Sequence, residues 1–235
     1  MDLGTILGVW AHPDDETYLS SGLMAQAVRD GRRVVCVTAT RGEGGSWDEQ
    51  RWPSSTLGAV REQELLRCLA VLGVTEHVFL DLPDVDMDTP LPADGAARVV
   101  EIMRDVRPDT VLTFGPEGMT GHAGHQSVSA WATAAFHAVA PSGARLYYAV
   151  DARDLGGTFE EELIAMGAVK PGVMPVRDDD DIDLRLDLPP ELLDLKMRAF
   201  AEQESQSAGM IETFGADRIR FMMSAECFQL AAEAP

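Results

Sequence analysis

The chain has 235 residues, 46% of them hydrophobic, and a formal net charge of -20 at pH 7. This length and composition suit a sizeable core, and we expect a single domain over residues 1–235. The negative charge argues against nucleic acid as a partner and against adhesion to anionic membranes.

Strand-like and helix-like segments alternate through the first part of the chain. Apolar runs of strand length lie at residues 5–10, 34–38, 77–82, 110–114 and 146–150. Apolar residues at helical spacing occupy residues 20–30, 57–72, 95–106 and 126–139. The alternation predicts an α/β fold with a Rossmann-like, doubly wound, mostly parallel sheet flanked by helices.

Beyond residue 150 the pattern loosens, and we expect a less regular C-terminal part. Residues 182–188 alternate between apolar and charged types, which predicts a half-exposed edge strand. Residues 190–206 predict one final helix.

The cysteines and the N-terminal segment bear on the compartment. Cys36, Cys68 and Cys227 are widely separated and form no C-x-x-C pair, which favours reduced thiols in the core over disulfides or a zinc knuckle. The N-terminus has no basic segment leading into a long apolar run, and no stretch reaches the roughly 18 apolar residues of a membrane span. We therefore expect a cytoplasmic protein without a membrane span.

An acidic motif follows the first predicted strand, in Ala11–Glu16. In an open α/β sheet, ligand sites form at the carboxyl ends of strands. His12 and Asp15 are three residues apart, so both side chains can converge on one metal ion, which leaves Asp14 free to act on a metal-bound water. The alternative is that the two carboxylates cap the N-terminus of the next helix.

A second cluster, His122 and His125, lies in the loop after a later strand. Alone, these histidines could cap the helix that follows. Three of the five histidines, however, lie in these two strand-end loops. His12, Asp15 and either His122 or His125 would make a site of two histidines and one carboxylate with an open position, as in catalytic zinc hydrolases.

At this point the chain resembles the PIG-L/LmbE-type family of zinc-dependent N-acetylglucosamine deacetylases, which includes enzymes of mycothiol and bacillithiol biosynthesis. The matching elements are Ala11–Glu16, Thr40–Glu43, Arg61–Glu64, Gly121–Gln126, and Lys196 with Ala199 and Gln206. The family fold is also Rossmann-like.

The resemblance implies a role for each motif residue. His12, Asp15 and His125 would hold Zn²⁺, with another divalent metal such as Fe²⁺ as the alternative. Asp14 would be the general base, and His122 would stabilise the oxyanion.

The implied reaction is hydrolysis of the acetamide of an N-acetylglucosaminyl conjugate, which gives acetate and a free amino sugar. An amidase of a larger sugar-thiol conjugate would use the same centre. A non-haem iron oxygenase and a non-catalytic sugar-binding protein are alternatives from other classes, since two histidines and a carboxylate also suit ferrous iron. The expected partner is a small-molecule amino-sugar conjugate, and a homo-oligomer is compatible with the family.

The resemblance also assigns substrate binding to Arg61 and Glu43. The alternative for Arg61 is a surface arginine paired with Glu64 or Asp48. Trp47 is either a platform for a sugar or an anchor for its loop.

Two positions depart from the family pattern. Gly124 stands where relatives commonly carry an aspartate, and Gln203 stands where they often carry a histidine. Without a neighbouring carboxylate, the pKa of His122 should be lower. Asp84, Asp86 and Asp88 alternate after a strand like half of a calcium loop, but the glycine and the closing glutamate of that motif are missing.

Overall fold

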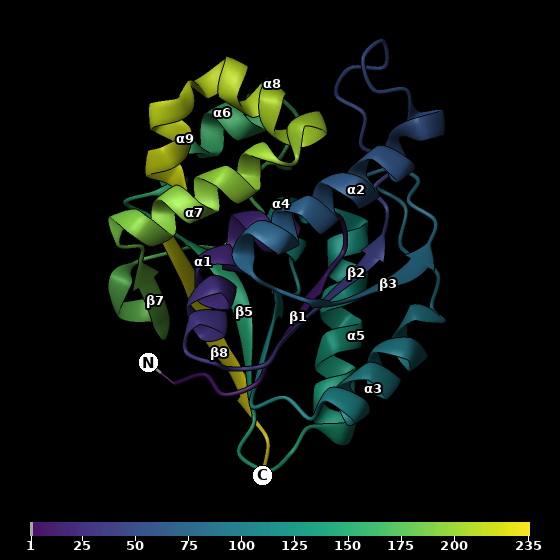
Figure 1. Ribbon diagram of the computed structural model, residues 1–235, viewed down its shortest axis with the longest axis vertical. Coiled ribbons are helices and arrows are strands. Elements are labelled where there is room, and N and C mark those ends of the chain that lie inside the picture. Colours follow the sequence, from purple (N-terminus) through teal and green to yellow (C-terminus); the bar gives the residue numbers. More distant parts are fainter. Residues whose placement is uncertain (1) are drawn as a thin grey trace.

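The computed structural model describes residues 2–235, and over these residues the chain forms an eight-stranded sheet flanked by helices (Figure 1). The strand order is β3-β2-β1-β4-β5-β8-β7, and a short strand, β6, pairs with β5. The strands are β1 (Ile6–Trp10), β2 (Val34–Thr40), β3 (Glu76–Leu82), β4 (Thr110–Phe114), β5 (Arg145–Ala152), β6 (Val176–Arg177), β7 (Leu184–Asp187) and β8 (Ala225–Glu233).

The first five strands are parallel and form the predicted doubly wound part. The helices that connect them are α1 (Asp15–Arg29), α2 (Ser54–Leu72), α3 (Gly95–Val106), the short α4 (Gly118–Gly121) and α5 (Ala123–Val139). β1 pairs with β2 on one side and β4 on the other, so the chain reverses its direction of travel across the sheet at β1. Such a switch point opens a crevice at the carboxyl ends of the strands.

Most predicted boundaries in this part are confirmed, and α3 and β4 match the expected ranges. β1 and β2 are buried along their whole length, as expected for central parallel strands whose faces are both covered by helices. α2 ends at Gly73 with φ 79°, a left-handed conformation that glycine adopts without strain. α1 begins at Asp15 rather than Ser20, because the first turn carries Asp15 and Glu16, which favour a helix N-terminus.

The C-terminal part departs further from the prediction. β7 is the expected edge strand, antiparallel to β8, and β8 is in turn antiparallel to β5. The single helix expected over residues 190–206 was wrong, because α7 (Pro190–Ala201) ends before Gln203 and two further helices follow, α8 (Glu204–Phe214) and α9 (Ala216–Met222). With the short α6 (Glu160–Ala165), α8 and α9 form a group at one end of the molecule (Figure 1).

Two large clusters of buried side chains support this arrangement, and a third, small one contains Val150, Ala152, Leu155 and Cys227. The larger of the two lies between the sheet and its flanking helices. The smaller of the two gathers apolar residues of the C-terminal helical group: Phe159, Leu163, Val169, Phe200, Met210, Phe214, Ile219 and Met223. The three cysteines are buried and free, as predicted.

A buried ion pair ties the C-terminal part to the parallel part. Lys196 on α7 donates to Glu226 on β8 over 2.8 Å, and both side chains are fully buried. Glu226 also accepts from the backbone N–H groups of Gly22 and Leu23 on α1. Removing one partner would leave an uncompensated buried charge, so the pair fixes the position of α7 over α1.

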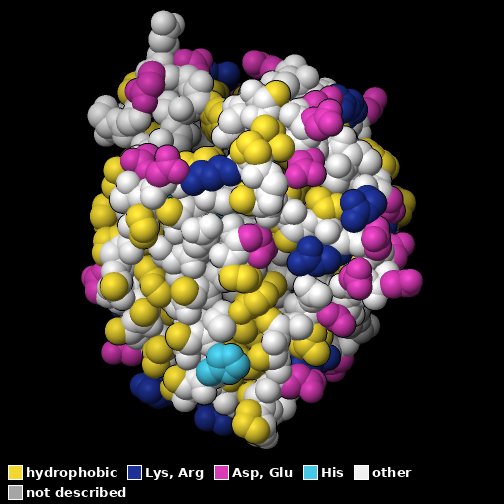
Figure 2. Space-filling model, turned by 180° about the vertical axis from the view of Figure 1, so that it is seen from behind, with side chains coloured by type: hydrophobic (Ala, Val, Ile, Leu, Met, Phe, Trp, Pro, Cys, Tyr) yellow, Lys and Arg dark blue, Asp and Glu magenta, His cyan; other side chains and the backbone are white. Residues whose placement is uncertain are grey.

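The surface carries the excess of acidic side chains. On the face shown in Figure 2, Asp and Glu side chains are spread around the molecule rather than gathered into one patch. Within residues 2–235, no helix combines the length and hydropathy needed to cross a membrane.

Candidate active site

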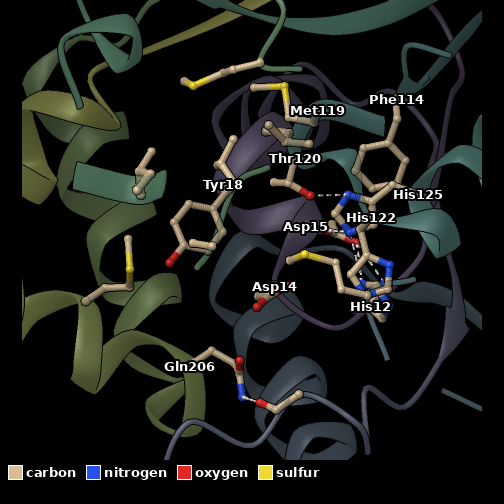
Figure 3. Close-up of a pocket in the computed structure, with 18 of the residues that line it drawn as sticks. His12, Asp14, Asp15, Tyr18, Phe114, Met119, Thr120, His122, His125 and Gln206 are labelled. Carbon is tan, nitrogen blue, oxygen red and sulfur yellow. Dashed lines mark hydrogen bonds and ion pairs between the residues drawn. The ribbon is translucent and has the colours of Figure 1, made fainter. Parts of the chain in front are cut away.

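The predicted site residues meet at the carboxyl ends of neighbouring strands. His12 and Asp14 lie between β1 and α1 and Asp15 is the first residue of α1, while His122 directly precedes α5 and His125 lies in its first turn. β1 and β4 are adjacent in the sheet, so residues separated by more than 100 positions come into contact. All five side chains line a cavity of about 430 Å³ (Figure 3).

The side chains of His12, Asp15 and His125 form a triangle at the base of this cavity. His12 Nδ1 lies 3.1 Å from His125 Nε2, Asp15 Oδ1 lies 3.4 Å from His125 Nε2, and the other Asp15 oxygen, Oδ2, lies 3.6 Å from His12 Nδ1. Ligand atoms at about 2.0–2.2 Å from a tetrahedral zinc ion are roughly 3.3–3.6 Å apart. The distances within the triangle are close to this spacing, so the three side chains could hold such an ion.

Backbone and side-chain contacts orient these donors. Asp15 Oδ2 accepts from the N–H groups of Ala11 (3.1 Å) and His12 (2.8 Å), which leaves Oδ1 directed at His125. His125 Nδ1 lies 2.9 Å from the carbonyl oxygen of Gly118, so it can donate there while Nε2 keeps its lone pair for a metal. Metal-binding histidines commonly donate their second N–H to an oxygen in this way.

Asp84, two residues after β3, lies beside the second ring nitrogen of His12, as the Gly118 carbonyl oxygen lies beside that of His125. Its Oδ1 lies 3.4 Å from His12 Nε2, an ion-pair contact without good hydrogen-bond alignment. Burial disfavours a charged His12, but the nearby carboxylates of Asp84 and Asp15 outweigh it and raise the pKa of His12. Burial likewise opposes charge on Asp84, yet His12 and Arg61 lower the pKa of Asp84 to about 2. An ionised Asp84 thus holds the His12 ring with Nδ1 toward the metal position.

His122 lies beside the triangle. Its ring stacks on His125 at 4.9 Å, and ligand atoms of His12, His122 and His125 lie within 4.8 Å of one another, so the three imidazoles are a second group that could hold a metal. His122 Nδ1, however, accepts from the Gly124 N–H at 3.0 Å. Burial, with the charges of His12 and His125, lowers the pKa of His122 to about 3. At neutral pH the ring is therefore uncharged, and its remaining hydrogen is on Nε2.

Asp14 has an unusual backbone conformation. Its φ is 116°, a region that residues other than glycine rarely adopt. The carboxyl Oδ2 lies 3.1 Å from Arg61, and the side chain is 18% exposed toward the cavity. Burial raises the pKa of Asp14 to about 7, against the opposing charge of Arg61. A strained residue of this kind persists only where its surroundings hold it in place.

Glu16 supplies part of that support. The side chain is fully buried, and its Oε2 accepts from the backbone N–H of Asp14 at 3.0 Å. Its Oε1 accepts from Thr17 Oγ1 (2.6 Å) and from Gln203 Nε2 (2.7 Å). The acidic motif is therefore bound to the junction between α7 and α8.

Comparison with known proteins agrees with this geometry. The family model described as "PIG-L: GlcNAc-PI de-N-acetylase" matches residues 7–136, more than half of the chain. The chain belongs to the PIG-L family.

Two curated PIG-L relatives carry the same name. The protein named 1D-myo-inositol 2-acetamido-2-deoxy-alpha-D-glucopyranoside deacetylase from Rhodococcus jostii is 29% identical over 86% of this chain and 81% of its own length. The protein of that name from Kineococcus radiotolerans is 35% identical, but the match covers 52% of this chain and only 42% of that protein.

Solved structures share the fold. N,N'-diacetylchitobiose deacetylase from Pyrococcus horikoshii has a TM-score of 0.67 at 20% identity, covering 97% of this chain and 84% of the other. The 4-carboxy-2-hydroxymuconate hydratase GalB, from a Pseudomonas putida strain, also reaches a TM-score of 0.67, at 17% identity over 99% of this chain and 98% of that one. Because the neighbours include a hydratase, the fold alone does not specify the reaction.

The two residues assigned to substrate binding occupy different places in this PIG-L protein. Arg61 is buried in the cavity wall, where it donates to the carbonyl oxygens of Gly42 and Pro13 and pairs with Asp14. The alternative of a surface arginine paired with Glu64 or Asp48 was wrong. The Glu64 carboxylate instead accepts from the N–H and the hydroxyl of Ser205.

Glu43 does not line the cavity, although Gly44, Gly45, Ser46 and Trp47 do. Its Oε1 accepts from the backbone N–H of Asp84 at 3.0 Å. Glu43 thus supports the loop that carries Asp84, and direct substrate contact by Arg61 or Glu43 stays a prediction.

Trp47 anchors its loop to α8, and its role as a platform for a sugar stays a prediction. The ring is 52% exposed at the cavity, and its Nε1 donates to Gln206 Oε1 on α8 at 3.0 Å.

Two contributors escaped prediction from the sequence. Asp84 follows a strand end just as the other site residues do, but the alternation with Asp86 and Asp88 drew attention to a calcium loop instead. Gln203, whose departure from the family pattern had no assigned consequence, contacts Glu16 across 187 positions. No local sequence signal marks such a contact.

Proposed function

We propose that the protein is a zinc-dependent N-deacetylase that removes the acetyl group from an N-acetylglucosaminyl conjugate, with acetate and a free amino sugar as products. The observation that carries the proposal is the triangle of His12, Asp15 and His125 donor atoms with Asp14 beside it in the cavity. Support also comes from the deacetylase activity for which the curated relatives are named.

The donor set fits zinc chemically as well as geometrically. Two imidazole nitrogens with one carboxylate oxygen, and room for a water, are the ligand set of catalytic zinc hydrolases. A zinc ion bound there would lower the pKa of a coordinated water and polarise the acetyl carbonyl.

The residues of the chain would supply the proton transfers. The Asp14 carboxylate, held by Arg61 and exposed to the cavity, accepts a proton from the attacking water. His122 is uncharged with its hydrogen on Nε2, so it donates a hydrogen bond to the oxygen that gains negative charge. Protonated Asp14 then returns its proton to the departing amine, which completes the cycle without a further residue.

The test uses the methyl glycoside of N-acetylglucosamine, with release of free amine as the measurement. We expect turnover by the zinc-loaded protein, loss of turnover after removal of the metal with a chelator, and recovery when zinc is added back. Amine release that survives complete removal of metal would contradict the proposal, as would no release by zinc-loaded protein from this or any other N-acetylglucosaminyl glycoside tested.

A further inference from the structure

The cavity continues from the metal-binding triangle to a wall rich in methionine. Of the 11 methionines in the chain, six line this one cavity: Met87, Met119, Met174, Met210, Met222 and Met223. We call these six side chains the methionine wall. They come from five separate points along the chain, including the loop after β3, α4, and the C-terminal helices α8 and α9.

The methionine wall lines the cavity and is also packed against the apolar clusters. Met87, Met119, Met174 and Met222 are half-buried; Met119 packs against the larger cluster, Met174 and Met222 pack against the smaller one, and Met210 and Met223 belong to the smaller one. Met119 is held at φ 59°, a left-handed conformation, in the segment that precedes His125. Figure 3 shows Met119 above the histidines, with further sulfur-bearing side chains around the space next to Tyr18.

The polar groups of the cavity are concentrated near the triangle. Arg61, Asp14 and Asp84 already contact one another or the histidines there. Beside the methionine wall, Glu226 is occupied by Lys196 and by backbone N–H groups of α1. The Tyr18 hydroxyl and the Asp151 carboxyl also line the cavity, so the lack of hydrogen-bond partners is a property of the methionine wall itself.

The wall is poorly suited to a polyol. Each hydroxyl placed against it would lose hydrogen bonds to water without gaining new ones. Thioether side chains are flexible and polarisable, and they adapt to alkyl and aromatic groups of varied shape. The substrate for which the curated relatives are named, by contrast, carries an inositol.

We propose that the substrate of this site is an N-acylated amino sugar that carries an apolar alkyl or aryl group, and that this group binds against the methionine wall. The inference rests on the proposed deacetylase function. The apolar group can be carried at the anomeric position, as an aglycone, or at the nitrogen, as a longer acyl chain, and both place the same chemistry in the cavity.

The test compares kcat/KM of the zinc-loaded protein for five substrates. They are the methyl, phenyl and octyl glycosides of N-acetylglucosamine, the N-acetylglucosaminyl-inositol, and the methyl glycoside of N-octanoylglucosamine. We expect a kcat/KM at least about 10-fold higher for a phenyl, octyl or octanoyl substrate than for the inositol compound. A preference among the glycosides places the group at the aglycone, and a preference for the octanoyl amide places it at the acyl chain.

The outcomes separate the two proposals. Turnover of the methyl glycoside with an equal or higher kcat/KM for the inositol compound would overturn the apolar preference and leave the deacetylase function standing. No turnover of any of the five contradicts the deacetylase function, and the apolar preference with it.

Variants of the wall test the location. Met174→Gln and Met222→Gln keep the length of the side chain but add a polar amide. We expect each to lower the ratio of apolar to inositol kcat/KM by about 3-fold or more. Met166→Gln is the matched control, since Met166 is also a half-buried methionine of the C-terminal part but does not line the cavity. An unchanged ratio in folded wall variants would overturn the proposed location, and if the variants do not fold, the substrate comparison on the unaltered protein decides.

Discussion

The two ends of the cavity differ in chemistry and in origin. The polar end is built by residues between His12 and His125, all within the segment that the PIG-L family model matches. Most of the methionine wall comes from residues beyond that segment. The difference suggests that reaction chemistry and substrate preference are specified by separate parts of the chain, so that one can vary while the other is kept.

The largest expected effect on kcat comes from altering the proposed base, Asp14, at the polar end of the cavity. Asp14→Asn removes the proton acceptor but keeps the size of the side chain. We expect kcat to fall by about 10²–10⁴-fold, the usual contribution of a general base, with zinc content unchanged. Amine release and zinc per chain would be measured together. The control is Asp194→Asn, an exposed aspartate paired with Arg220 on the far helices, which should leave kcat unaltered. Near-normal kcat in Asp14→Asn would remove it from the mechanism.

A smaller effect is expected from the partner of His12. Asp84→Asn removes the charge that orients the ring, and loss of such a partner typically weakens metal binding by about 10–100-fold. Competition with a zinc chelator measures this directly. Asp88→Asn, four residues further on and with its side chain 85% exposed, is the matched control. Equal zinc affinity in both variants would show that Asp84 does not support the metal site.

The contact between the two parts of the chain can be tested at Gln203. Gln203→Leu keeps a similar volume but removes the donor to Glu16, and we expect kcat to fall by about 3–10-fold while zinc affinity stays constant. Gln203→His, which introduces the residue often found in relatives, can donate to Glu16 and should restore most of the loss. Equal kcat in the leucine variant would show that Asp14 is positioned without help from α8.

The smallest expected effect is on thermal stability and concerns the charge of Asp151, which lines the cavity. Burial raises the pKa of Asp151 to about 7, against hydrogen bonds from the backbone N–H groups of Gly156 and Ala152. The folded state thus favours the neutral carboxyl. Its stabilising contribution is complete below pH 4 and is lost as the pH rises through about 7.

Asp151→Asn, which is neutral at every pH, should therefore raise Tm by about 2–4 °C at pH 8 relative to the unaltered protein. The gain should disappear near pH 4. Thermal unfolding across this range gives the result, and a Tm difference that does not change with pH would contradict a raised pKa for Asp151.

The parallel part of the fold was predictable because its signals are local. Strand runs such as 110–114 and the helix over 95–106 carry their own apolar pattern, and the strand-end rule placed His12 and His125 together although they lie 113 positions apart. The same rule would have found Asp84 after β3.

The C-terminal part was less predictable because long-range contacts shape it. Helical spacing continues through residues 190–206, but the helix is interrupted at Gln203, whose side chain contacts Glu16 on α1. β8 has an alanine-rich sequence with little strand preference, and it is a strand because it lies between β5 and β7. The methionine wall joins residues from five separate points, so no pattern along the chain marks it.

The most direct test of the account is the zinc content of two variants, Asp15→Ala and His122→Ala, measured by native mass spectrometry after reconstitution. The account predicts that His122→Ala keeps one zinc ion per chain and that Asp15→Ala loses it, because Asp15 completes the triangle with His12 and His125. Retention of zinc by folded Asp15→Ala and its loss from His122→Ala would contradict the account and assign the metal to the three histidines instead.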